Sequence, residues 1–187
     1  MTALTPLFPG KLVPPLVVST VRHGDWKLAD QSPKNFTMIV FYRGYHCSFC
    51  SRYLADLDRK LSKFADHGVE AIAISSDPRD RAENARLDWK LGGLTIGYDM
   101  RLSGAREWGL YISSRRYAPV TGIEEPPFFI EPGLFLVRPD NTLYWASVQT
   151  MPFARPSFAD ILSALDLVIE KNYPARGEVV DLPVGPG

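Results

Sequence analysis

An apolar run, FTMIVFY at residues 36–42, is followed after a short gap by residues with a helical pattern. This succession of a strand and a helix constrains the fold class more than any other feature of the chain. The apolar and β-branched residues of the run are typical of a strand buried on both faces of a sheet. The apolar residues after it recur at spacings of four and three, as in a helix with one buried face. They are Cys50, Leu54, Leu57, Leu61 and Phe64. A buried strand that leads into an amphipathic helix is the building unit of an α/β domain.

The chain continues this alternation of strands and helices before it ends in a hairpin and a helix. VEAIAIS predicts a second buried strand, and LTIGYD predicts a short third one. Between them we expect a helix capped by Asp77 and begun by Pro78, which ends at residues 92–93. RLSGAREWGL predicts a short helix, GLFLVRPDNTLYWASVQ a hairpin, and SFADILSALDLVIE an amphipathic helix.

Residues outside these elements predict an arm, a loop and a tail. The proline-rich residues 1–15 predict an extended arm, followed by a small hairpin turned at His23 and Gly24. Residues 111–132 predict a long loop that covers the active site or contacts a second subunit, and residues 174–187 a flexible tail. We therefore expect one α/β domain with its core at about residues 12–170. Its central sheet is mixed, flanked by helices and extended by the N-terminal hairpin.

Charge and hydropathy exclude several classes of partner. The 21 basic and 21 acidic residues give a formal net charge of zero, and no basic run offers a path for a phosphate backbone, so we expect no nucleic acid. The longest apolar runs, such as residues 133–137, are far too short to cross a membrane. The first residues do not resemble a secretory signal, so we expect a cytoplasmic protein.

Both cysteines of the chain, Cys47 and Cys50, lie where the predicted strand meets the predicted helix. The unpaired amides and the dipole of a helix N-terminus favour a thiolate, so we expect Cys47 to be an exposed nucleophile with a lowered pKa. Cys50 heads the buried stripe of the helix and is better placed to resolve a mixed disulfide. Two alternatives stay open: a pair of core cysteines without chemistry, and half of a zinc site, for which a second ligand pair is missing.

The segments FYRGYHCSFCSRYLADL, VEAIAISSD and EPGLFLVRPDNTLYWASVQ resemble the peroxiredoxin-like proteins of the alkyl hydroperoxide reductase and thiol-specific antioxidant (AhpC/TSA) family. This family lies within the thioredoxin-fold superfamily, and the resemblance covers about residues 12–170. It implies a thioredoxin-like fold and thiol-dependent reduction of disulfides or hydroperoxides. Aligned on the family motif, Cys50 takes the place of the peroxide-attacking cysteine and Cys47 that of a threonine, which opposes the assignment from the helix dipole.

Three positions depart from the peroxiredoxin pattern. Arg43 stands where the motif has proline, Cys47 replaces the threonine, and Pro132 replaces an arginine that precedes GLF. Pro132 would suit the cis-proline that faces the disulfide in thioredoxins. These departures favour disulfide exchange, while the resemblance keeps peroxide reduction open.

Three further residues are candidates to support the sulfurs. Glu131, beside Pro132, would raise a cysteine pKa or pass protons to the buried thiol, unless it is an exposed loop residue. A protonated His46 would stabilise a thiolate, or His46 only fills space in the turn. Arg43 would orient a peroxide or thiolate, or merely cover the end of the strand.

These observations predict a thiol-dependent oxidoreductase that cycles Cys47 and Cys50 between dithiol and disulfide without metal or organic cofactor. Its partners would be a disulfide or hydroperoxide substrate and an external reductant, either a thioredoxin-like protein or a low-molecular-weight thiol. A homodimer is compatible with the sequence. The alternative is a redox-responsive binding module whose disulfide changes its affinity for a partner.

Overall fold

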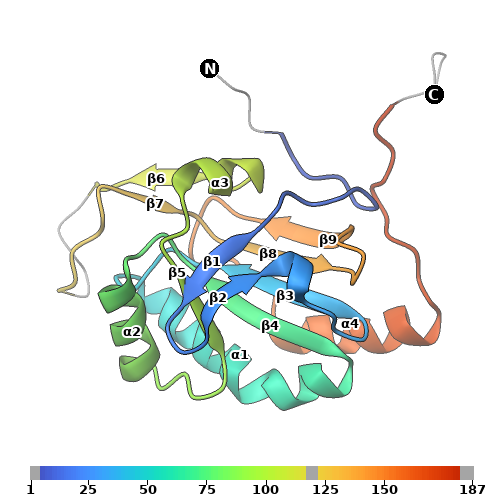
Figure 1. Cartoon of the computed structure of the whole chain (residues 1–187), viewed down its shortest axis with the longest axis horizontal. Coiled ribbons are helices and arrows are strands. Elements are labelled where there is room, and N and C mark those ends of the chain that lie inside the picture. The colour runs from blue at the N-terminus through green and yellow to red at the C-terminus, as the bar shows by residue number, and fades with distance from the viewer. Residues whose placement is uncertain (1–4, 117–121, 182–187) are drawn as a thin grey trace.

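The computed structural model describes residues 5–116 and 122–181, and its centre is a seven-stranded sheet (Figure 1). The strands are β1 (Val17–Thr20), β2 (Gly24–Lys27), β3 (Phe36–Phe41), β4 (Val69–Ile74), β5 (Thr95–Tyr98), β8 (Gly133–Val137) and β9 (Leu143–Val148). They lie in the order β2-β1-β5-β4-β3-β8-β9. The three central strands are parallel, and antiparallel strands flank them on both sides. The predicted mixed sheet is therefore confirmed, with antiparallel strands at both edges rather than only at its end.

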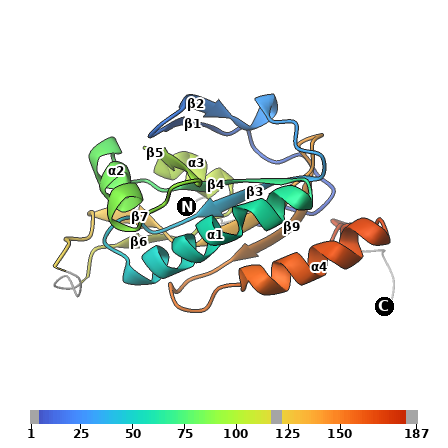
Figure 2. The ribbon, with the colours of Figure 1, turned by 90° about the horizontal axis from the view of Figure 1, so that it is seen from below.

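Helices cover both faces of this sheet. They are α1 (Ser48–Asp66), α2 (Arg79–Asp88), α3 (Leu102–Glu107) and α4 (Phe158–Glu170), and a short 3-10 turn spans Leu28–Asp30. Figure 2 shows α1 and α4 side by side on one face, where His67 at the end of α1 contacts Asp166 of α4. α3 packs against the opposite face.

The alternation of side chains along β3 explains why helices are needed on both faces. Met38 and Val40 point into the core under α1 and α4, whereas Ile39 and Phe41 point into the core under α3. Every residue of β3 is buried, as the apolar run predicts. β3 therefore lies in the centre of the sheet, and a short loop connects its C-terminal end to the start of α1.

The start and the end of α1 both agree with the sequence pattern. Cys47 is the N-cap residue, with extended backbone, and the helix begins at Ser48. The chain leaves the helix through Gly68, whose φ of +66° lies in the left-handed region that favours glycine. The helix buries Cys50, Leu54, Leu57 and Phe64 on the predicted face.

The segment predicted as a long loop, residues 111–132, contains a second, two-stranded sheet of β6 (Ile112–Ser114) and β7 (Phe128–Ile130). Backbone hydrogen bonds connect the arm at residues 5–13 to the start of β9, such as that from Gly10 N–H to the Leu143 carbonyl (2.7 Å). The outermost parts of the predicted arm and tail, residues 1–4 and 182–187, lie outside the described residues. None of the helices within the described ranges is long and apolar enough to cross a membrane.

Candidate active site

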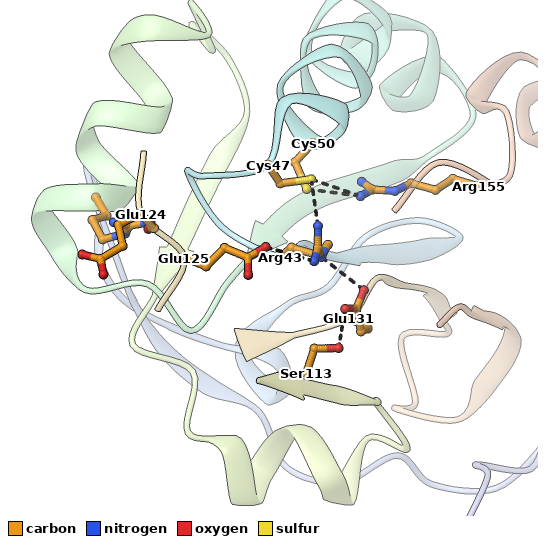
Figure 3. A network of polar contacts seen from close by, with 9 residues as sticks. Arg43, Cys47, Cys50, Ser113, Glu124, Glu125, Glu131 and Arg155 are labelled. Atoms are coloured by element: carbon orange, nitrogen blue, oxygen red, sulfur yellow. Dashed lines mark hydrogen bonds and ion pairs between the residues drawn. The ribbon is translucent and has the colours of Figure 1, made fainter. Parts of the chain in front are cut away.

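Cys47 and Cys50 lie inside the protein, after the C-terminal end of β3, and no disulfide joins them. Cys47 is 4% exposed and Cys50 is fully buried, so the prediction of an exposed Cys47 is wrong. Both cysteines belong to the core beneath α1, and two arginine side chains contact their sulfurs, Arg43 from the loop before α1 and Arg155 from the segment before α4 (Figure 3). The order of exposure nevertheless agrees with the prediction, since Cys50 is the more deeply buried of the two.

The two arginines bring positive charge to the sulfurs. The Arg43 guanidinium approaches the Cys47 sulfur to 3.9 Å. The Arg155 guanidinium lies 3.2 Å from the sulfur of Cys50 and 4.0 Å from that of Cys47. In a buried site a cation at this distance favours the charged form of a thiol.

The two thiols consequently differ in acidity. A hydrogen bond from the Cys50 thiol is the largest influence on Cys47, and with Arg155 and Arg43 it lowers the pKa of Cys47 to about 5, against the opposing effect of burial. Burial and the adjacent Cys47 raise the pKa of Cys50 well above its usual value. This difference in acidity favours a thiolate on Cys47 and a neutral thiol on Cys50.

Glu131 lies behind Arg43 and is buried, not exposed. Its carboxylate accepts a hydrogen bond from the Ser113 hydroxyl (2.6 Å) and pairs with Nε of Arg43 at 3.3 Å. Burial raises the pKa of Glu131. Arg43 also pairs with Glu125 at 3.6 Å, so two carboxylates hold the guanidinium that reaches Cys47. The segment predicted to cover the active site thus supplies Ser113, Glu125 and Glu131 to it.

His46 is buried against the ring of Phe129, with 4.8 Å between ring centroids. Burial, together with the positive charges of Arg43 and Arg81, lowers the pKa of His46 to about 3. The imidazole is therefore neutral at physiological pH. The prediction that a protonated His46 stabilises the thiolate is wrong, because burial and the two neighbouring arginines keep the imidazole neutral.

Pro132 is buried and follows a trans peptide bond, since no cis peptide occurs in the part of the chain that the structure describes. Its carbonyl accepts a hydrogen bond from the Gln149 amide (2.9 Å). The prediction of a cis-proline at this position is wrong. Pro132 instead leads from β7 into β8.

The loop at residues 43–47 is anchored by a buried carboxylate. Asp77 was expected to cap α2, but Pro78 is the N-cap residue, and the Asp77 side chain turns beneath the loop. It accepts hydrogen bonds from the Tyr45 amide (2.6 Å) and from Nε of Arg81 (3.1 Å). Gly44 passes directly over it with a φ of +128°. This contact fixes the loop that carries Arg43 and Cys47.

Arg155 contacts both sulfurs, and the sequence pattern does not reveal it. It lies in the segment between β9 and α4, 105 positions from Cys50, and no motif marks it. The absence of an arginine before GLF suggested that the site lacks this charge. In the folded chain Arg155 supplies a guanidinium to the sulfurs from another segment.

Among the described residues, no group of three or more histidine, cysteine or acidic side chains is arranged to hold a metal ion. Residues 117–121 lie outside that description.

Comparisons with known proteins agree with the fold. Residues 9–146 match the model of the AhpC/TSA family. No curated protein matches the chain. Similar solved structures include a cysteine-to-serine mutant of peroxiredoxin 6 of Arenicola marina, with a TM-score of 0.69, 17% identity, and coverage of 89% of this chain and 75% of that chain. Peroxidoxin BcpB from Mycobacterium tuberculosis has a TM-score of 0.67 and 16% identity, covering 87% and 98%.

The thiol peroxidase from Chromobacterium violaceum is also similar, with a TM-score of 0.65, 14% identity, and coverage of 90% of this chain and 89% of that chain. At such identities the structural likeness bears on the fold alone. The predicted thioredoxin-like fold is thereby confirmed.

Proposed function

Because this chain belongs to the AhpC/TSA family and is a thiol-dependent oxidoreductase, we propose that it reduces hydroperoxides with Cys47 as the attacking thiolate and Cys50 as the resolving thiol. The observation that carries the proposal is the unequal acidity of the two sulfurs. Cys47 has a pKa of about 5 beside two guanidinium groups, whereas Cys50 is a buried thiol with a raised pKa. This division gives each sulfur one step of a two-step cycle.

In the first step the Cys47 thiolate attacks the terminal oxygen of the hydroperoxide. A sulfur–oxygen bond forms, the oxygen–oxygen bond breaks, and the departing alkoxide or hydroxide takes up a proton and leaves as alcohol or water. Cys47 is oxidised to a sulfenic acid. Arg43 and Arg155 lie where negative charge moves from sulfur to the departing oxygen, and their guanidinium groups stabilise that charge in a buried site.

In the second step the Cys50 sulfur attacks the sulfur of the Cys47 sulfenic acid. A disulfide forms, the sulfur–oxygen bond breaks, and the hydroxide leaves as water with the proton of Cys50. The two residues are on the same first turn, with the Cys50 amide donating to the Cys47 carbonyl (2.9 Å), so the sulfurs are already neighbours. An external thiol then reduces the disulfide.

Restricted access favours a hydroperoxide over a protein disulfide as substrate. Cys47 is only 4% exposed, so little of the residue is open to a bulky partner. A hydroperoxide end group is small, whereas a protein disulfide needs room for two chain segments. The sequence-based argument for disulfide exchange is also weakened, since Arg155 supplies an arginine that Pro132 does not.

A second assignment of the same chemistry makes Cys50 the peroxide-attacking sulfur. The alignment with the family motif favours it, and so does Arg155, which is nearer to Cys50 than to Cys47. The deep burial and raised pKa of Cys50 oppose it. We place the reaction in the cytoplasm, with a thioredoxin-like protein or a low-molecular-weight thiol as reductant and with a homodimer as a compatible assembly.

Repeated turnover tests the proposal. The reduced protein, supplied with hydrogen peroxide and excess dithiothreitol, should consume many equivalents of peroxide per protein. Without dithiothreitol it should stop after one equivalent, with a Cys47–Cys50 disulfide found by mass spectrometry of peptides. One oxidation without recycling would instead favour the redox-responsive binding module. Oxidation by disulfides but not by peroxide would replace peroxide reduction with disulfide exchange.

A further inference from the structure

The β9–α4 segment, residues 149–157, connects the last strand of the sheet to the last helix. It lies outside the part of the chain that matches the family model. Its residues 150–155 make no backbone hydrogen bond to another described residue. Close to α4, the Tyr53 hydroxyl donates a hydrogen bond to the Pro156 carbonyl (2.8 Å). Side-chain contacts therefore position the middle of this segment.

Two side chains of the β9–α4 segment contact the first turns of α1. Phe153 lies against Phe49, with 5.7 Å between ring centroids, but Phe153 is 64% exposed. Arg155 instead points inward, and its guanidinium lies 3.2 Å from the Cys50 sulfur and 4.0 Å from the Cys47 sulfur (Figure 3). The inward contact of the segment is thus a contact with the reacting atoms.

The sulfurs are the hydrogen-bond partners of Arg155 among the described residues. Its Nε and Nη1 atoms are buried without a hydrogen-bond partner. No carboxylate of a described residue forms an ion pair with it. Its guanidinium also lies 5.0 Å from the ring centroid of Tyr53. Because a buried charge without a counter-charge is strongly destabilising, the inward position of Arg155 depends on negative charge at the sulfurs.

We infer that the β9–α4 segment is a redox-sensitive strap, which is closed over the sulfurs while Cys47 is a thiolate and opens when Cys47 and Cys50 form a disulfide. In this oxidation the thiolate, the thiol, one hydroperoxide and one proton from solvent give the disulfide, an alcohol and water. The sulfurs lose two electrons and the hydroperoxide gains them. The disulfide is uncharged, so Arg155 loses its counter-charge and moves into solvent with its segment.

The inference rests on the disulfide of the proposed function and adds how that disulfide becomes accessible. The closed segment covers the sulfurs of the reduced protein, where Cys47 is 4% exposed. Movement of Arg155 into solvent opens the same place to the external thiol that reduces the disulfide. Oxidation and reduction of the sulfurs would then meet two different arrangements of the β9–α4 segment.

Modification of Arg155 by phenylglyoxal, which reacts with accessible guanidinium groups, measures the opening. Reduced full-length protein and protein oxidised with diamide are treated in parallel, and mass spectrometry quantifies the modified peptides. Diamide takes up the two electrons, one proton from Cys50 and one from solvent, so the test does not depend on peroxide reduction. Arg59, whose side chain is 67% exposed, is the internal reference.

We expect the rate constant for Arg155, divided by that for Arg59, to rise about tenfold or more on oxidation. Cys47→Ser should show the fast rate without oxidant, because no thiolate then faces Arg155. Cys47→Asp is the matched control, since its carboxylate keeps a negative charge at an N-cap position that aspartate favours, and it cannot form the disulfide. It should show the slow rate with and without diamide.

An unchanged rate for Arg155 in oxidised protein that carries the disulfide would overturn the inference while the proposed function stands. A slow rate in reduced Cys47→Ser, or a fast rate in Cys47→Asp, would also overturn it, because negative charge would then not hold Arg155 in place. Failure of diamide to link Cys47 to Cys50 would refute the disulfide cycle of the proposed function, and the inference with it.

Discussion

Replacing Cys47 by serine is expected to lower the rate constant for oxidation by hydrogen peroxide by about a thousandfold or more. A serine hydroxyl stays protonated at neutral pH, so the attacking anion is lost. The remaining thiol, Cys50, is fully buried with a raised pKa and would react slowly. Stopped-flow fluorescence of the reduced protein, mixed with excess peroxide, measures this loss.

Cys50→Ser is the matched variant, and we expect it to keep the first step within about tenfold of the wild type. The hydrogen bond from Cys50 lowers the pKa of Cys47, so its removal raises that pKa, but the serine hydroxyl can donate in its place. Without a resolving thiol, Cys47 should stop as a sulfenic acid that dimedone traps. If oxidation instead survives in Cys47→Ser and vanishes in Cys50→Ser, Cys50 is the attacking cysteine, as the family alignment suggests.

Gly44→Ala is expected to lower the free energy of unfolding by about 3 kcal/mol and to slow oxidation of Cys47. An added Cβ would lie 2.7–2.9 Å from the carboxylate of Asp77, and the φ of +128° is one that alanine rarely adopts. Backbone strain and overpacking each cost about 1–3 kcal/mol. The loop that carries Arg43 and Cys47 must then move away from Asp77.

Two other glycines serve as controls for this substitution. Gly24 has a φ of +71° with open space around the added Cβ, so Gly24→Ala should cost only the backbone strain, about 1 kcal/mol. Gly92 has neither a positive φ nor a close neighbour, so Gly92→Ala should be close to neutral. Urea unfolding of the three variants gives the comparison. Equal losses for Gly44→Ala and Gly24→Ala would show that the contact with Asp77 is not tight.

The fold was predictable where the chain repeats a simple period. The unbroken apolar run of β3 and the spacing of Cys50, Leu54, Leu57 and Phe64 on α1 each identify an element without knowledge of its neighbours. The position of the cysteine pair follows from these two elements alone. The junction of strand and helix was therefore visible in the sequence.

The surroundings of the sulfurs were not predictable in the same way, because they depend on contacts between distant segments. Arg155, which follows β9 in the chain, contacts Cys50 across 105 positions, and Asp77 accepts a hydrogen bond from the Tyr45 amide 32 positions away. The burial of Cys47 and His46 likewise results from groups that other segments bring over them. A local pattern indicates the start of a helix but not what covers it.

Arg155 also changes how the departures from the peroxiredoxin pattern are interpreted. Pro132 replaces an arginine in the sequence, yet the site holds two guanidinium groups, from Arg43 and Arg155. Positive charge is therefore present beside the sulfurs although Pro132 replaces that arginine. Its source is a different segment of the chain.

The central claim, that Cys47 carries a thiolate at neutral pH, is tested most directly by titrating the ultraviolet absorbance of the thiolate. The reduced wild type, Cys47→Ser and Cys50→Ser are compared from acid to alkaline pH. We expect one thiolate that appears with a midpoint near pH 5 in the wild type, because the pKa of Cys47 is about 5, and that is absent at neutral pH in Cys47→Ser. A thiolate that appears only under alkaline conditions, or that persists in Cys47→Ser and is lost in Cys50→Ser, would contradict the claim.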